Sequence, residues 1–189
     1  MKSDGQRELI PPDDTLRLIG ALNAMKATFN DYAQQWQLLD ESGHVPDKPS
    51  YTELLGHATS AQDLSRDVLR LTGEFAASLH STNRAGRATL AHLAMASTLS
   101  VRATAYFLEA SEAALGLQRS SSPTDQRYVK WRMVIGHASA RDFLLRTSDS
   151  LRGAAKELDD HLDFQRFLST LTPRQHPALP PPRPSGRHR

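Results

Sequence analysis

The sequence predicts an all-α protein whose core is an antiparallel up-down-up-down bundle of four long helices. Apolar residues recur alternately three and four positions apart along four stretches of roughly 30 residues, which gives each helix one apolar face. Prolines separate these stretches and do not interrupt them. No stretch shows the alternation of apolar and polar residues that is typical of a strand. Short connections would make neighbouring helices run antiparallel.

Composition favours one soluble globular domain with tails. The chain has 189 residues, of which 39% are hydrophobic and 23% charged, enough to bury a core without disulfides or metals. The absence of cysteine excludes disulfide bonds, thiol catalysis and thiolate metal sites. The preference for arginine over lysine and the many alanines are typical of a GC-rich bacterial genome.

No segment of the sequence predicts a membrane span or a secretory signal. The most apolar stretch, Leu90 to Val101, is interrupted by His92 and falls short of the roughly 20 residues that a span needs. Residues 1–10 carry four charges and no apolar run. We therefore expect a cytoplasmic protein without a membrane partner.

The first two helices are expected at Asp13 to Asp40 and from Ser50 to about His80. Acidic residues at the first start suit the positive end of the helix dipole, and Ser50-Tyr-Thr-Glu53 is a capping box. The predicted apolar faces are Leu18, Leu22, Met25, Phe29, Tyr32, Trp36 and Leu39 in the first helix, and Leu54, His57, Ala61, Leu64, Val68, Leu71 and Phe75 in the second.

The third and fourth helices are expected at Arg84 to Leu115 and from Ser122 onward. Ser81 to Asn83 would cap the third, Gly116 would end it, and Ser122-Pro-Thr-Asp125 starts the fourth, with a possible break at Asp159 to Asp163. Their predicted apolar faces are Leu93, Ala96, Ser100, Ala103, Phe107, Ala110 and Ala114, and Trp131, Val134, Ala138, Leu144, Leu151, Ala155, Leu158 and Leu162.

Charge and proline content divide the chain into a flexible N-terminus (1–12), the bundle domain (13–171) and a disordered tail (172–189). The tail is basic, with four arginines and no acid, and contains Pro180-Pro-Pro-Arg-Pro184, which cannot pack as a helix. Residues 1–171 keep 19 of the 23 basic residues against 21 acidic ones, a formal net charge of −2. The basicity of the chain therefore belongs to the tail, which could bind an aromatic groove or nucleic acid, or bind nothing.

Two histidines occupy matching positions in the second and fourth helices. Leu54-Leu-Gly-His-Ala58 resembles Val134-Ile-Gly-His-Ala138, which suggests a duplicated helical hairpin. An antiparallel bundle would bring His57 and His137 to one height, near Glu109 and Glu112 of the third helix, and imidazole with carboxylate could hold a divalent metal or a small ligand. The alternative is a structural pair of neutral, hydrogen-bonded imidazoles, and the Glu-x-x-His motif of di-iron bundles is absent from the helices.

Basic residues gather around the start of the fourth helix. Tyr128 and Trp131 are interleaved with them, as in surfaces that bind nucleic acid, although the pattern favours Trp131 in the core and the cations on a solvated rim. The residues that this hypothesis assigns to nucleic-acid contact are Arg119, Arg127, Lys130 and Arg132, together with Arg183, Arg187 and Arg189 of the tail.

No catalytic motif is present in the sequence. It contains no glycine-rich phosphate loop and no nucleophile elbow, so we expect neither an enzyme nor a cofactor. The preferred hypothesis is a non-enzymatic interaction or regulatory protein that binds a protein partner or associates with itself. The alternatives are a metal- or ligand-binding bundle and a protein with weak nucleic-acid contacts.

Overall fold

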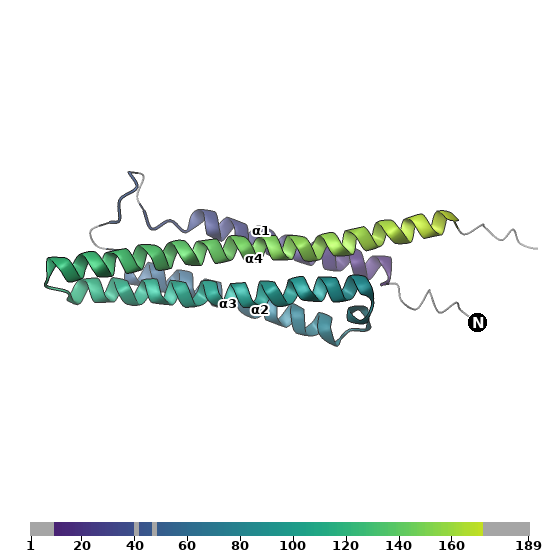
Figure 1. Ribbon diagram of the computed structural model, residues 1–189, viewed down its shortest axis with the longest axis horizontal. Helices are drawn as coiled ribbons and strands as arrows, with labels where there is room; N and C mark the ends of the chain where they lie inside the picture. Colours follow the sequence, from purple (N-terminus) through teal and green to yellow (C-terminus); the bar gives the residue numbers. More distant parts are fainter. Residues whose placement is uncertain (1–9, 40–41, 47–48, 172–189) are drawn as a thin grey trace, which may run out of the picture.

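The computed structural model describes residues 10–39, 42–46 and 49–171, and these ranges form an all-α bundle. The helices are α1 (Pro12–Gln35), α2 (Tyr51–Ala77), α3 (Arg84–Arg119) and α4 (Pro123–Leu171), with a 3-10 turn, η2 (Leu79–Thr82), between α2 and α3. They run alternately up and down, and α4 continues past the ends of the other three (Figure 1). The described residues contain no strand, so the predicted fold class is confirmed.

The helix starts follow their predicted signals. Ser50 accepts a hydrogen bond from the backbone N–H of Glu53 at 3.2 Å, and Asn83 accepts one from Gly86 at 2.7 Å. At α4, Pro123 is the first helical residue and Asp125 lies in the first turn. At α1, Pro11 occupies the cap position without a side-chain cap, so the two aspartates in the first turn do not cap the helix and act on its start through the helix dipole.

The helix ends differ from prediction in three places. The backbone leaves α1 at Trp36, and Leu39, expected on the apolar face, is 43% exposed. Gly116 does not end α3, because the helix continues to Arg119, where Ser120 bonds back to the carbonyl of Gly116. Helix α4 runs unbroken through Asp159 to Asp163, since the acids there face solvent while Leu158 and Leu162 stay buried.

The α3–α4 hairpin is the centre of the packing. Helix α2 lies against α3 and α1 against α4, whereas the backbones of α1 and α2 remain further apart than those of the other neighbouring helices. Small residues permit the close approach of α3 and α4: a Cβ atom added to Gly136 would lie 3.3 Å from the carbonyl oxygen of Tyr106 and 3.6 Å from the Cβ of Ala110.

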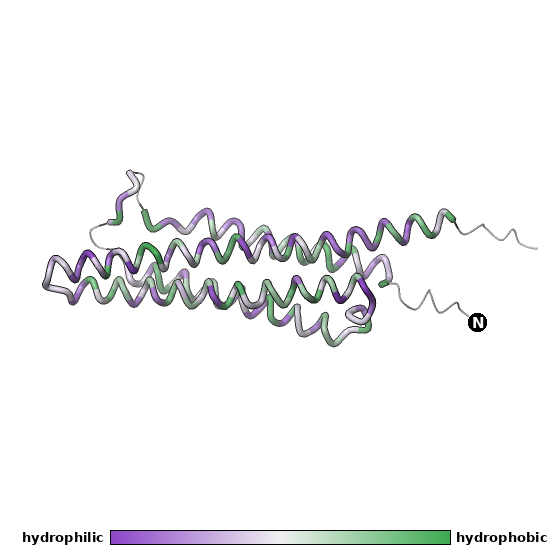
Figure 2. Tube along the Cα trace, viewed as in Figure 1, coloured by the Kyte–Doolittle hydropathy of each residue, from purple (hydrophilic) through white to green (hydrophobic). Residues whose placement is uncertain are grey.

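The core follows the predicted apolar faces except at the start of α4. Apolar and polar residues alternate along the helices, as the hydropathy colours show (Figure 2). Phe29, Val68 and Phe107 are fully buried, as predicted. In α4, however, Trp131 and Ala138 are exposed, and the residues that face inward are Met133, Gly136, His137 and Ala140. The apolar face of α4 is therefore turned relative to prediction over its first turns, because the inward line passes through a glycine and a histidine.

Polar contacts between helices are few and specific. Hydroxyl pairs join α2 to α3, with 3.2 Å between Ser65 and Ser100 and 3.0 Å between Thr72 and Ser97. Arg141 of α4 donates from Nε to the carbonyl oxygen of Ala33 at 2.7 Å. That carbonyl belongs to the last turn of α1, where a cation also suits the negative end of the helix dipole.

Ile10, which the sequence assigned to a flexible segment, is fully buried. Its N–H donates to His161 Nε2 at 3.2 Å, and its carbonyl accepts from Gln165 at 2.6 Å, so the chain before α1 is bound to α4. The expected disordered tail, 172–189, lies outside the described residues. Among the described helices, none combines the length and apolar character that crossing a membrane requires.

Candidate functional site

The bundle brings His57 and His137 together, as predicted. Their ring centroids are 5.7 Å apart, and His137 is only 2% exposed. Helix α2 supplies the first ring and α4 the second, each directly after a glycine. Buried Nδ1 of His57 and buried Nε2 of His137 have no hydrogen-bond partner among the described residues. The structural alternative, a pair of neutral, hydrogen-bonded imidazoles, stays a prediction.

Aromatic rings surround the histidine pair. Trp36 stacks on His57 with 4.7 Å between centroids, and Phe107 contacts both imidazoles edge-on, at 5.8 Å from His57 and 5.3 Å from His137. On the far side of the cluster, Tyr32 stacks on Trp36 with 4.5 Å between the ring centroids. Because Trp36 lies just after α1, each of the four helical segments contributes a ring to this point.

Burial keeps both imidazoles neutral near pH 7. Loss of hydration, together with the smaller effects of the neighbouring His57 and Arg141, lowers the pKa of His137 to about 4. The pKa of His57 is also lowered by burial, against a smaller opposing effect of Glu53. A cavity of about 160 Å³ reaches His57 from the surface between the 36–50 connection and the first turn of α2.

The two predicted carboxylate ligands do not join the histidines. Glu109 and Glu112 are exposed on α3, and no group of three or more metal-ligating side chains occurs in the described ranges. The outward position follows from the helix, because residues 107, 110, 111 and 114 occupy its inward face. What remains of the predicted metal site is the pair of imidazoles.

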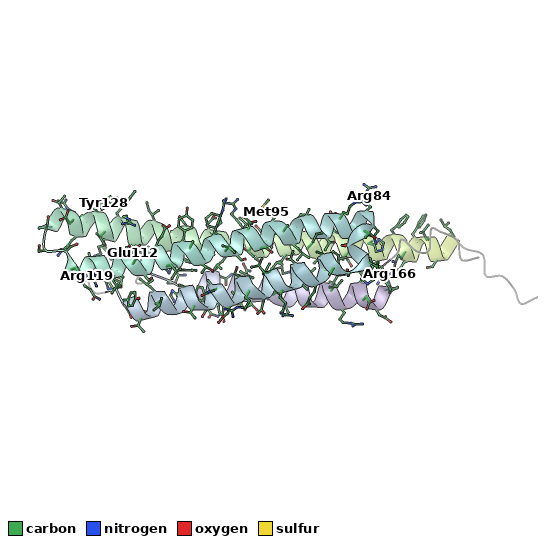
Figure 3. All side chains as sticks on the ribbon, turned by 90° about the horizontal axis from the view of Figure 1, so that it is seen from below. Arg84, Met95, Glu112, Arg119, Tyr128 and Arg166 are labelled. Carbon is green, nitrogen blue, oxygen red and sulfur yellow. The ribbon has the colours of Figure 1, made fainter. Side chains whose placement is uncertain are left out.

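The basic surface at the start of α4 is divided. Arg127, Lys130 and Arg132 share the first three turns of α4; Arg127 and Arg132 are exposed and Lys130 is partly exposed. Arg119, at the end of α3, lies on the other side of the hairpin from Tyr128 (Figure 3). Arg183, Arg187 and Arg189 lie outside the described residues. The structure therefore groups three of the seven residues assigned to nucleic-acid contact.

Two aromatic rings lie on the outer side of this basic surface. Tyr128 is 61% exposed and Trp131 60%, and their rings stack with 6.4 Å between centroids. The interpretation of Trp131 as a core residue is wrong, because the inward line of α4 passes through Met133 and His137 instead. A cavity of about 510 Å³ between the end of α3 and the start of α4 is lined by Leu117, Pro123, Gln126, Arg127 and Lys130, and neither ring lines it.

The far end of α4 carries an apolar surface that the sequence analysis did not assign to a function. Phe164, Phe167 and Leu171, here called the α4 tip row, are 53%, 57% and 60% exposed. Their spacing of three and four residues places them on one helix face. The last buried residue of α4 is Leu162, so the row lies beyond the core, on the projecting end. The i, i+3, i+7 spacing beyond the last interior leucine was the signal available in the sequence.

A groove between α1 and α2 is a further consequence of their separation. It has a volume of about 340 Å³, a floor of Leu18, Leu71 and Phe75, and a rim that includes Asp14 and His80, 3.6 Å apart. Sequence reasoning missed it because helix periodicity does not report the distance between helices.

Comparison with protein-family models, with curated proteins and with solved structures found no match for this chain.

Proposed function

We propose that this chain is a non-enzymatic protein-binding bundle that inserts the projecting end of α4 into an apolar groove of a partner protein. The observation that supports this function is the exposure of the α4 tip row, with Phe164, Phe167 and Leu171 each more than half exposed on one face. Anchors at i, i+3 and i+7 are typical of helices that bind in grooves. Large apolar side chains gathered on a surface are typical of interaction sites.

The size of the row favours a groove over a second copy of the chain. Two half-exposed phenylalanines and a leucine offer on the order of 300 Å² of surface. A stable interface buries about 800 Å² on each partner, so pairing two such rows face to face would be too small. A groove that encloses the projecting helix on several sides reaches that size, because the helix stands clear of α1, α2 and α3 there (Figure 1).

The charges beside the row indicate the chemistry of the groove. Lys156 and Arg166 already pair with Asp160 and Asp163. Asp159 has no ion-pair partner among the described residues and is exposed. The turn of α4 that leads into the projecting end therefore carries one acidic charge outside these pairs, which a basic residue on the groove rim would complement.

The test replaces Phe167 by a photo-cross-linking amino acid in the full chain, inside cells of the source organism. We expect one predominant protein adduct, identified by mass spectrometry and then purified. Its affinity for the full chain should fall about tenfold or more in Phe164→Ser and in Leu171→Ser, because both remove an anchor at the centre of the contact. The matched control is Leu69, 50% exposed on α2, where the cross-linker should give no such adduct and Leu69→Ser should leave the affinity unchanged.

Two outcomes would overturn the proposal. Equal adducts at positions 167 and 69, or affinities that the tip substitutions do not change, would show that the row is not the contact. Sedimentation of the purified chain as a dimer that Phe167→Ser dissociates would assign the row to self-association instead.

A further inference from the structure

The start of α4 combines three features that the proposed binding of a partner protein by the α4 tip row does not use. Tyr128 and Trp131 present stacked rings to solvent, with Ile135, 42% exposed, one turn further on. An exposed tryptophan on the surface of a monomer leaves a large apolar area in contact with water, which is unfavourable unless something binds there. This end of α4 lies at the opposite end of the bundle from the tip row (Figure 1).

The cations beside these rings lack the ion pairs that many other surface arginines make. Along the helices, surface arginines pair with acids three or four positions away, as in Arg17 with Asp14, Arg66 with Asp63 and Arg152 with Asp149. Arg127, Lys130 and Arg132 make no ion pair with any part of the chain that the structure describes, although Arg127 and Arg132 are exposed and Lys130 is partly exposed. Three positive charges without internal partners, at the positive end of a helix dipole, form a surface that attracts anions.

The shape of the surface places a cavity beside two of these cations. Arg127 and Lys130 line the hollow of about 510 Å³ that separates the end of α3 from the start of α4. Both residues precede Trp131 in the sequence, Arg127 by four positions and Lys130 by one. An anionic group bound by these cations would therefore lie next to a flat aromatic surface.

The geometry points to single-stranded nucleic acid as the ligand of this surface, with bases stacked on Trp131 and Tyr128 and phosphates bound by Arg127, Lys130 and Arg132. Unpaired strands offer both groups at once, because every base has an exposed flat face and every nucleotide a negative charge. A duplex hides the faces of its bases in the stack. An acidic peptide would use the cations without the rings.

The test measures binding of the full chain to fluorescein-labelled oligo-dT of about 12 nucleotides by anisotropy. Trp131→Ala should weaken binding about 5- to 150-fold, the effect of losing one base–aromatic stack, while Trp131→Phe should keep most of the affinity. Lys130→Ala should weaken binding and flatten the slope of log K against log salt by about 0.7, the value for one phosphate contact on a single strand. A matched duplex should bind more weakly and without dependence on Trp131.

The matched control is Arg84→Ala. Arg84 is an exposed cation, without an ion pair in the described ranges, at the other end of α3 (Figure 3). Its loss should leave oligonucleotide binding unchanged. Circular dichroism should show the same helix content for every variant, since each substituted side chain is on the surface.

Three results would overturn the inference. The first is no binding of the wild-type chain at about 50 mM salt, where electrostatic contacts are strongest. The second is equal binding by wild type and Trp131→Ala, which would assign the affinity to the arginines of the tail. The third is binding to phosphatidylserine vesicles, but not to the oligonucleotide, that Trp131→Ala abolishes.

Discussion

Two neutral imidazoles stay inside this bundle although each has a buried nitrogen without a hydrogen-bond partner among the described residues. Leaving such a nitrogen unpaired costs about 1–3 kcal/mol, and a charged imidazole would cost more. The charged groups that act on the pair are Glu53 on α2 and Arg141 on α4, while Trp36 and Phe107 present uncharged rings from the α1 and α3 sides. Burial and the positive charge of Arg141 on the same helix therefore both disfavour protonation of His137.

Acid should destabilise the fold through this pair. The pKa of His137 is lowered from 6.5 to about 4, so between these values the unfolded chain binds the proton that the folded chain does not. Stability from this group is complete above pH 6.5 and is lost as pH falls toward 4, by up to about 3 kcal/mol. Chemical unfolding at a series of pH values should show this decline.

The comparison is the double variant His57→Leu/His137→Leu. It should be as stable as wild type or more so at pH 7, and its stability should change less between pH 6.5 and 4, because it removes both groups with unpaired nitrogens. An equally steep decline in the variant would place the acid sensitivity elsewhere, for example at His161, which accepts the N–H of Ile10 and has a pKa lowered by burial.

At the residue scale, the sequence predicted the histidine pair but not the exposure of Trp131. The pair was predictable because both histidines lie on the inward faces of their helices. The lengths of the connections between helices determine how far along the bundle each histidine lies. Trp131 was misplaced because its hydrophobicity suggested burial, whereas the inward line runs through Gly136 and His137. Glycine is selected there by the close approach of α3, which periodicity does not reveal.

Two glycines of this bundle, Gly86 and Gly136, stand where the backbones of two elements approach closely, and one turn depends on such a contact. Gly86, in the first turn of α3, lies against the backbone of η2, and a Cβ there would overlap the carbonyl oxygen of His80. Backbone atoms cannot move aside as a flexible side chain can. The junction of α2, η2 and α3 therefore requires glycine at this position.

Two glycine substitutions should have opposite effects. Gly86→Ala should destabilise the protein by about 2–4 kcal/mol, because η2 must shift to admit the methyl group. Gly73→Ala, in the interior of α2 with open space around it, should stabilise by about 0.5–1 kcal/mol through helix propensity. Thermal and urea unfolding of the two variants would check both signs, and a neutral Gly86→Ala would refute the contact.

Helix starts were predictable and helix ends were not. Caps such as Ser50 and Asn83 act within one turn of their own helix, so the sequence contains the whole interaction. The end of α1 depends on a distant partner: beyond it, the ring of Trp36 lies on His57, which belongs to α2. Similarly, α4 continues beyond Asp159 because buried Leu158 and Leu162 bind it to the rest of the core.

The molecule as a whole should not need its tail for stability. The last residue of α4 in the core is Leu162, and residues 172–189 have the proline content of a segment that cannot pack as a helix. Deletion of 172–189 should leave helix content and melting temperature nearly unchanged by circular dichroism. A fall of many degrees would show that the tail covers apolar surface. Weak duplex binding, if present in the full chain, should be lost with the tail cations.

The dependence of α1 on α4 has a consequence for synthesis of the chain. Helices α3 and α4 are joined by three residues, so their hairpin can form quickly, whereas the contact of Arg141 with Ala33 spans 108 positions. On a ribosome, which adds about 5–20 residues per second, α1 emerges first but finds its partner only after α4 has followed. Until then Leu22 and Phe29, fully interior in the folded protein, have no helix to pack against. The first helix to be synthesised is thus the last to pack into the bundle. Its apolar face is the one that a chaperone would bind on the nascent chain.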